Sequence, residues 1–164
     1  MKAIQVYQVD AFTNECFKGN PACVCILKEE IEDKYMQLIA KEMNLSETAF
    51  LRMPEDWDIN KTNIFSLRWF TPECEVDLCG HATIATSEIL FNVMGIKNDK
   101  IIYETKSGRL IANKNSDGIS LDFPIDEYLS ADLSNDVLEA MGIENYEDAV
   151  IGKNTKKLVI RVKT

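Results

Sequence analysis

Residues 68–83 read RWFTPECEVDLCGHAT and combine the end of a strand, an acidic loop and the start of a helix. The β-branched and aromatic run over residues 62–70 predicts a long strand that ends at Thr71-Pro72, because proline is excluded from the interior of a central strand. Gly80 then opens a helix over residues 81–94, whose apolar residues lie on nearly all sides. The stretch therefore predicts a sheet packed around a buried helix.

The residues before this stretch supply the first half of the sheet. Residues 3–9 and 22–27 are typical of strands, and the Gly-Asn-Pro segment at 14–21 is typical of the loop between them. Residues 31–43 place apolar side chains at helical spacing, which predicts an amphipathic helix packed on the sheet. Residues 46–53 then return as a strand.

The residues after the buried helix continue the same pattern. Residues 100–111, 118–124 and 149–162 alternate apolar and polar side chains like strands, with one short helix near residues 135–141. We therefore expect an α+β fold, in which a curled mixed β-sheet or barrel wraps around a central buried helix. A single lobe is expected over residues 1–164. The amino end of the central helix would lie near the rim of the sheet, where its free N–H groups can bind an anion.

Composition and charge exclude several classes of function. Lys and Arg number 18 against 27 Asp and Glu, which gives a net charge of −9 and argues against nucleic-acid binding. No apolar run approaches the roughly 20 residues that cross a bilayer, so membrane insertion is not expected. The first residues lack the apolar core of a signal peptide, and a cytoplasmic location is expected.

The cysteines predict neither a disulfide framework nor a metal site. There are five of them, an odd number, together with a single histidine and no Cys-x-x-Cys pair, whereas structural zinc needs four closely spaced ligands. Cys23 and Cys25 lie two apart in an apolar run, so both are expected on one face of a strand as small core residues.

Glu47 is the first candidate for chemistry. It stands in NLSETAF, residues 44–50, where the amphipathic helix gives way to a strand. A carboxylate among such apolar neighbours is partly withdrawn from water, which favours its use as a general base or acid. The alternative is that Glu47 points to solvent beside Ser46 and Thr48.

The second candidate is the turn formed by Cys79, Gly80 and His81. Glycine permits close approach of the backbone to a ligand, and His81 on the first helical turn can donate a hydrogen bond or move a proton. Alternatively, His81 is a buried histidine bonded to a nearby carbonyl. Cys79 can be a thiol activated by the helix amino end, although a packing role is the preferred interpretation.

Five ordered blocks in this chain resemble a known family. They are DAFT at 10–13, FKGNPA at 17–22, NLSETAF at 44–50, RWFTP at 68–72 and CGHAT at 79–83. In order and spacing they resemble the phenazine-biosynthesis PhzF-like isomerases. The resemblance implies a fold similar to diaminopimelate epimerase, with two related lobes and an active site in the cleft between them.

The resemblance also implies roles for individual residues. Glu47 matches the family's proposed acid/base, which moves a proton between two carbons of a small carboxylic acid, and His81 matches a histidine that contacts the substrate. Gly80 and Ala82 would offer N–H groups to the substrate carboxylate, and Asn20 falls in a loop that lines the same cleft. The family needs no metal or organic cofactor.

Two alternatives remain open at this stage. Related epimerases use one cysteine from each lobe, so Cys79 raises a rival cysteine-based racemase mechanism, although Glu47 is favoured. Family members are nearly twice as long, so the resemblance covers an amino-terminal half only. One lobe alone would leave a wall of the cleft exposed, so we expect a homodimer or a missing second lobe to cover it. The second hypothesis is a non-catalytic binding or assembly module with the same fold.

The sequence does not identify the substrate. Phe50 and Phe70 near the expected cleft would suit an acid with an unsaturated or cyclic body, unless these rings belong to the core.

Overall fold

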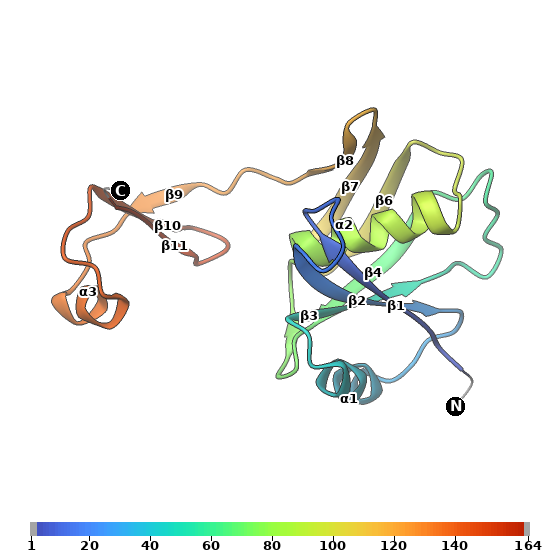
Figure 1. Cartoon of the computed structure of the whole chain (residues 1–164), viewed down its shortest axis with the longest axis horizontal. Helices are drawn as coiled ribbons and strands as arrows, with labels where there is room; N and C mark the ends of the chain where they lie inside the picture. The colour runs from blue at the N-terminus through green and yellow to red at the C-terminus, as the bar shows by residue number, and fades with distance from the viewer. Residues whose placement is uncertain (1–2, 163–164) are drawn as a thin grey trace. The chain divides into compact units, whose positions relative to one another are not determined.

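The computed structural model describes residues 3–162 (Figure 1). Its contacts divide the chain into two compact units, Met1–Phe123 and Pro124–Thr164. The first unit holds the large sheet and the central helix, and the second holds a small sheet and a short helix. The expectation of a single lobe over residues 1–164 stays a prediction.

The first unit contains eight strands and two helices, one of which continues into a π-helical turn. The strands are β1 Gln5–Ala11, β2 Asn20–Leu27, β3 Glu47–Arg52, β4 Ile64–Phe70, β5 Glu75–Val76, β6 Lys100–Thr105, β7 Gly108–Asn115 and β8 Gly118–Asp122. The helices are α1 Asp33–Met43 and α2 Gly80–Glu88, followed by the π-helical turn η1 Ile89–Val93.

The large sheet is mixed and curls around α2. Its strands follow the order β1-β2-β3-β4-β6-β7-β8, and the two-residue strand β5 pairs with β4. The β2–β3 and β4–β6 pairs are parallel, whereas the other pairs are antiparallel. α2 contacts β1, β2 and β3 near one end of this order and β8 at the other, so the sheet wraps around the helix (Figure 1). The predicted α+β class, with a curled sheet around a buried helix, is confirmed.

α2 is buried although it contains several hydroxyl side chains. Thr83 donates to the carbonyl of Cys79 at 2.6 Å, Thr86 to that of Ala82 at 2.7 Å, and Ser87 to that of Thr83 at 2.7 Å. Each hydroxyl thus bonds to the carbonyl four residues earlier, which satisfies its polar group inside the core. The helix can therefore lie inside the curled sheet, with only one partly exposed stripe formed by Gly80, Ile84 and Glu88.

The sheet has a hydrophobic core on each of its faces. The face toward α2 is filled by residues such as Val24, Leu51 and Trp69. The other face packs under α1 through Cys23, Cys25, Phe50, Phe70, Met36 and Ala40. The predicted core role of Cys23 and Cys25 is confirmed.

The two aromatic residues that had suggested a substrate with a cyclic body belong to this second core. Phe50 and Phe70 are 2% and 3% exposed, and their rings meet edge to face with centroids 5.4 Å apart. Both lie on the face that packs under α1. Of the two possibilities raised from the sequence, the core assignment is the correct one, and these rings say nothing about a substrate.

Most predicted elements form, with differences at turns. Residues 100–111 had been expected to alternate like a strand, but they form β6 and the start of β7, because a turn intervenes where the hydroxyl of Thr105 donates to the Gly108 carbonyl and Gly108 has a φ of 95°. The predicted helix at residues 135–141 is confirmed as α3.

None of the helices within residues 3–162 has the length and apolar composition to cross a bilayer.

The second unit is small and sparsely buried. It contains β9 Tyr128–Ser130, α3 Asn135–Met141, β10 Asp148–Gly152 and β11 Leu158–Arg161. The three strands form a sheet of order β11-β10-β9. Among its described residues, up to position 162, Ala149 alone is a buried hydrophobic residue, while Leu129 and Val159 are more than half exposed.

Candidate active site

Glu47 owes its position to the end of α1 and to the pairing of β3. Asn44 ends α1 in the left-handed conformation, with a φ of 52°, and its N–H donates to the Ala40 carbonyl at 3.1 Å. Glu47 begins β3 three residues later, in parallel register with Ala22 of β2. Since side chains alternate along a strand, Glu47 shares the face of Ala49, which lies in the core around α2.

The start of α2 is positioned by the β4–β5 hairpin. Arg68 of β4 donates to both carboxylate oxygens of Glu75 in β5, at 2.7 and 2.8 Å, and its third nitrogen donates to Asp33 of α1 at 2.8 Å. The Arg68 guanidinium holds the pKa of Glu75 below its usual range, and Lys106 adds to this effect. This clamp fixes the strand from which the chain enters α2 at Gly80.

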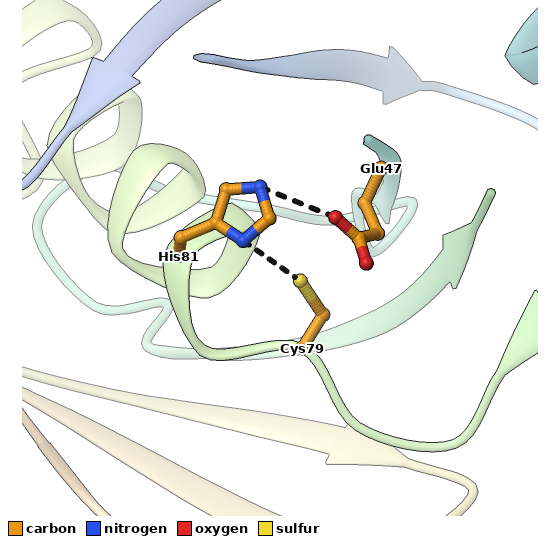
Figure 2. Close-up of side chains that lie close together, drawn as sticks. All are labelled: Glu47, Cys79 and His81. Atoms are coloured by element: carbon orange, nitrogen blue, oxygen red, sulfur yellow. Dashed lines mark hydrogen bonds and ion pairs between the residues drawn. The ribbon is translucent and has the colours of Figure 1, made fainter. Parts of the chain in front are cut away.

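Glu47, Cys79 and His81 converge at the amino end of α2 (Figure 2). His81 Nε2 lies 3.4 Å from Glu47 Oε2, and His81 Nδ1 lies 3.4 Å from Cys79 Sγ. Ser46 Oγ is also within hydrogen-bonding distance of His81 Nε2, at 3.2 Å. One oxygen, one sulfur and one nitrogen from the three residues lie within 4.8 Å of one another. The His81 side chain is 9% exposed and that of Glu47 is 22% exposed. Of these two side chains, Glu47 is therefore the one that solvent reaches more readily.

Cys79 is held as a thiol. Burial raises its pKa to about 11, and the negative charge of Glu47 acts in the same direction. Hydrogen bonds from the backbone N–H groups of Ala82 and His81 lower the pKa, but they do not overcome the burial. The helix amino end therefore does not make Cys79 a thiolate near neutral pH.

A protonated Cys79 determines how the other two side chains can bond. A thiol that donates to Nδ1 requires that nitrogen to be unprotonated, and a neutral imidazole then carries its hydrogen on Nε2. The Nε2–H can donate to the Glu47 carboxylate, which lies 3.4 Å away. This contact between Nε2 and Oε2 orients the Glu47 side chain beside His81.

The residues predicted from the sequence fall into two groups. Glu47, Cys79 and His81 are in contact, and Gly80 and Ala82 form the first turn of α2 beside them. Glu47 is therefore not a strand residue that simply points to solvent. Asn20 is exposed at the start of β2, two residues before Ala22, the register partner of Glu47. Because β2 and β3 are parallel, Asn20 and Glu47 lie at the same end of these two strands.

Sequence reasoning missed two residues around the site. Ser46 had been considered only as a solvent-exposed neighbour of Glu47, but it contacts the imidazole of His81. Its position directly before Glu47 is the one signal that could have indicated it. Phe123 lies beside Gly80, where an added methyl group would be 3.7 Å from its ring. Nothing local in the sequence connects residues so far apart in the chain.

Comparisons with known proteins place the chain among related sequences. Residues 9–164 match the model of a family described as phenazine biosynthesis-like protein, PhzC-PhzF. An uncharacterized isomerase of Halalkalibacterium halodurans is 43% identical over 164 residues, which cover 99% of this chain and 58% of that protein. The chain thus spans less than two thirds of this relative.

Solved structures show the same relationship. The crystal structure of a phenazine biosynthesis protein of the PhzF family from Enterococcus faecalis has a TM-score of 0.81 and 38% identity, and the match covers 98% of this chain and 57% of that one. A predicted epimerase from Pseudomonas aeruginosa has a TM-score of 0.68 and 19% identity, with 92% and 57% covered, which shows a common fold alone.

Proposed function

Because this chain belongs to the phenazine biosynthesis-like (PhzC-PhzF) family, we propose that it supplies the catalytic wall of an isomerase that moves a proton on a small carboxylic acid. The relative at 43% identity is named an isomerase, which agrees with this class of reaction. The observation that carries the proposal is the contact between the partly exposed Glu47 and the buried His81 at the amino end of α2.

In the proposed reaction Glu47 acts first as a base and then as an acid. Its carboxylate accepts a proton from one carbon of the substrate, and the electron pair left behind is delocalised toward the unsaturated or carbonyl part of the molecule. The protonated Glu47 then returns the proton to another carbon, or to the other face of the same carbon. Neither step changes the oxidation state of the substrate or requires a metal or organic cofactor.

The neighbouring groups have complementary roles in this proposal. His81 orients Glu47 through Nε2 and contacts the substrate. Asn20 lies at the same end of the strands as Glu47 and lines the cleft there. The N–H group of Gly80 lies at the positive end of the α2 dipole, where a substrate carboxylate is stabilised, whereas the N–H of Ala82 bonds to the Cys79 sulfur. The surplus of acidic residues in the chain agrees with a small-molecule ligand rather than a nucleic acid.

The proposed active unit is larger than this chain. The match covers 58% of the related isomerase and 57% of the E. faecalis structure, and the Glu47 side chain remains 22% exposed. Efficient proton transfer requires a site from which water is excluded. We infer that a second wall, from further residues of a longer protein or from a second copy, closes the cleft. Light scattering on the chain and on the longest product of its gene would distinguish these sources.

The first prediction concerns Glu47→Gln. We expect it to lower the rate of proton transfer by about 10²–10⁴-fold, because the amide cannot act as a base. The assay incubates the longest product of the gene with a panel of small carboxylic acids in deuterated water and follows deuterium incorporation or isomer formation by NMR.

The matched control for this assay is Glu42→Gln. It makes the same chemical change at an exposed position of α1, and it should leave the rate unchanged. Full activity in Glu47→Gln would exclude the proposed base. A properly folded protein that exchanges protons on none of the acids would instead favour the alternative of a binding module.

The second prediction separates Glu47 from the cysteine-based alternative. Cys79→Ser keeps a hydrogen-bond donor beside His81, so a mechanism based on Glu47 predicts a rate within about tenfold of the wild-type rate. A racemase that uses Cys79 as its acid or base predicts nearly complete inactivation at unchanged stability. The same NMR assay, together with urea unfolding of both proteins, decides between these outcomes.

A further inference from the structure

The side chains of Glu47, Cys79 and His81 present a combination of ligand atoms that zinc prefers. They offer a carboxylate oxygen, a sulfur and an imidazole nitrogen within 4.8 Å of one another. Among residues 3–162, no other group of three such side chains comes this close together. Three protein ligands with one open position are the arrangement found in zinc sites that bind a water or a substrate.

We propose that Glu47, Cys79 and His81 form a binding site for a soft divalent cation of the Zn²⁺ class, and that occupation of this site inhibits proton transfer. The binding depends only on the geometry of the three side chains. The inhibition rests on the function proposed above, because it requires Glu47 to be the base.

The spacing of the three side chains is close to that of a metal site. Zinc bonds of about 2.3 Å to sulfur and 2.0–2.2 Å to nitrogen or oxygen place tetrahedral ligands about 3.3–3.6 Å apart. Cys79 Sγ and His81 Nδ1 are already 3.4 Å apart. Glu47 now lies at the opposite nitrogen, Nε2, so its side chain must rotate toward the sulfur. Its partly exposed position at the start of β3 leaves room for this rotation.

The surroundings of His81 suit a ligand role for Nδ1. Metal-binding histidines usually donate their other N–H to an oxygen, which fixes the orientation of the ring. Ser46 Oγ lies 3.2 Å from His81 Nε2 and provides that oxygen. When the ion binds, the Cys79 proton is released to solvent and a metal–sulfur bond replaces the S–H bond. The thiolate and the Glu47 carboxylate together balance the two positive charges of the ion.

Inhibition follows from how the ligands are used. A Glu47 oxygen bound to the ion no longer offers a free lone pair to a substrate C–H group, and the ion also occupies the space beside the helix amino end. The other cysteines do not provide an equivalent site. Cys23 and Cys25 are close, with sulfur atoms 3.9 Å apart, but both are fully buried. Cys16 and Cys74 are exposed thiols outside the three-residue group.

The test uses Co²⁺ as a spectroscopic substitute for Zn²⁺ on the whole 164-residue chain. We expect one Co²⁺ per chain, with a thiolate-to-cobalt charge-transfer band and the visible bands of tetrahedral coordination, all removed by added Zn²⁺. Cys79→Ser should abolish the charge-transfer band. Glu47→Gln and His81→Asn should weaken binding by at least about tenfold. The double variant Cys16→Ser/Cys74→Ser is the matched control and should bind like the wild type.

Several results would overturn the site. They are a charge-transfer band that survives in Cys79→Ser, a band that disappears in the Cys16→Ser/Cys74→Ser control, or unchanged affinity in Glu47→Gln. Should Cys79→Ser fail to fold, Glu47→Gln decides the question, because glutamine has nearly the same shape as glutamate and Glu47 is the most exposed of the three side chains.

A separate measurement tests the inhibition. Zn²⁺ should suppress proton transfer at the concentration at which it displaces Co²⁺, and a chelator should restore it. If Zn²⁺ binds without loss of proton transfer, the inhibitory role is wrong, but the metal-binding site is still supported. Complete absence of proton transfer in metal-free protein would overturn the proposed function and with it the inhibitory role, while the cobalt spectrum still decides whether the site exists.

Discussion

At the scale of single residues, Cys79 shows two opposing influences on one thiol. The amino end of α2 directs N–H groups at its sulfur, which favours the thiolate, whereas burial and the charge of Glu47 favour the neutral thiol. Burial has the larger effect, because only 6% of the residue is exposed to water. The result is a neutral thiol beside His81, 3.4 Å from its Nδ1, which agrees with the proposed role of Glu47 as the base.

The third prediction follows from the raised pKa of Cys79. The folded-state pKa of about 11 lies above the ordinary value of 9.0, so the neutral thiol contributes stability below pH 9 that is lost as the pH rises toward 11. The full effect corresponds to about 2–3 kcal/mol. Urea unfolding at several pH values in this window, with a chelator present, should show a shallower loss of stability for Cys79→Ala than for the wild type. Equal slopes would show that Cys79 titrates normally in the folded protein.

At the scale of secondary-structure elements, the clamp between β4 and β5 carries the fourth prediction. Arg68→Lys should lower the free energy of unfolding by about 1–2 kcal/mol, because lysine cannot bond both oxygens of Glu75 and also reach Asp33. Arg109→Lys is the matched control. Arg109 bonds Glu104 at 3.0 Å on the surface, and its replacement should change the stability by less than about 0.5 kcal/mol. Chemical denaturation measures both, and similar losses would show that the clamp is no stronger than a surface pair.

The elements that the sequence predicted well are those with a strong local pattern. The helix over residues 81–94 was evident because it is apolar on nearly all sides, and it is observed as α2 with the π-helical turn. The two-residue strand β5 and the three-residue strand β9 were not predicted, because two or three positions are too few to show the alternation of polar and apolar residues that marks a strand.

The side of the sheet that each residue faces was harder to predict. β3 is buried on both faces over Thr48–Leu51, so no alternation of polar and apolar residues shows that Phe50 packs under α1 while Glu47 faces α2. The candidate residues Glu47, Cys79 and His81 were found from motifs in the sequence. Their mutual contact, and the part played by Ser46, depend on the sheet register and could not be predicted from the chain alone.

At the scale of the whole molecule, the two compact units differ in how much apolar surface they bury. The Met1–Phe123 unit has a core on each face of its sheet, whereas Ala149 is the single buried hydrophobic residue among the described positions of the Pro124–Thr164 unit. Local stability follows buried apolar contact. The two units are therefore expected to open with different free energies.

The fifth prediction tests this difference by hydrogen exchange and mass spectrometry. In the isolated chain, the amides of β9, β10 and β11 should exchange at least about tenfold faster than those of β2 and β3, which corresponds to a difference in opening free energy of about 1.4 kcal/mol or more. Equal protection in both sets of strands would show that the second unit is stabilised by contacts that its burial does not reveal.

The register between β2 and β3 has a consequence for how chains of this kind can change in length during evolution. Glu47 lies three residues after Asn44, which caps α1, and is paired with Ala22, so one residue added or removed in that link would turn the carboxylate toward the opposite side of the sheet. The segment over residues 53–63 joins β3 to β4 at the far end of β3, so its length does not set the side of the sheet that Glu47 faces. Gaps should therefore accumulate in homologues there and be absent between Asn44 and Glu47.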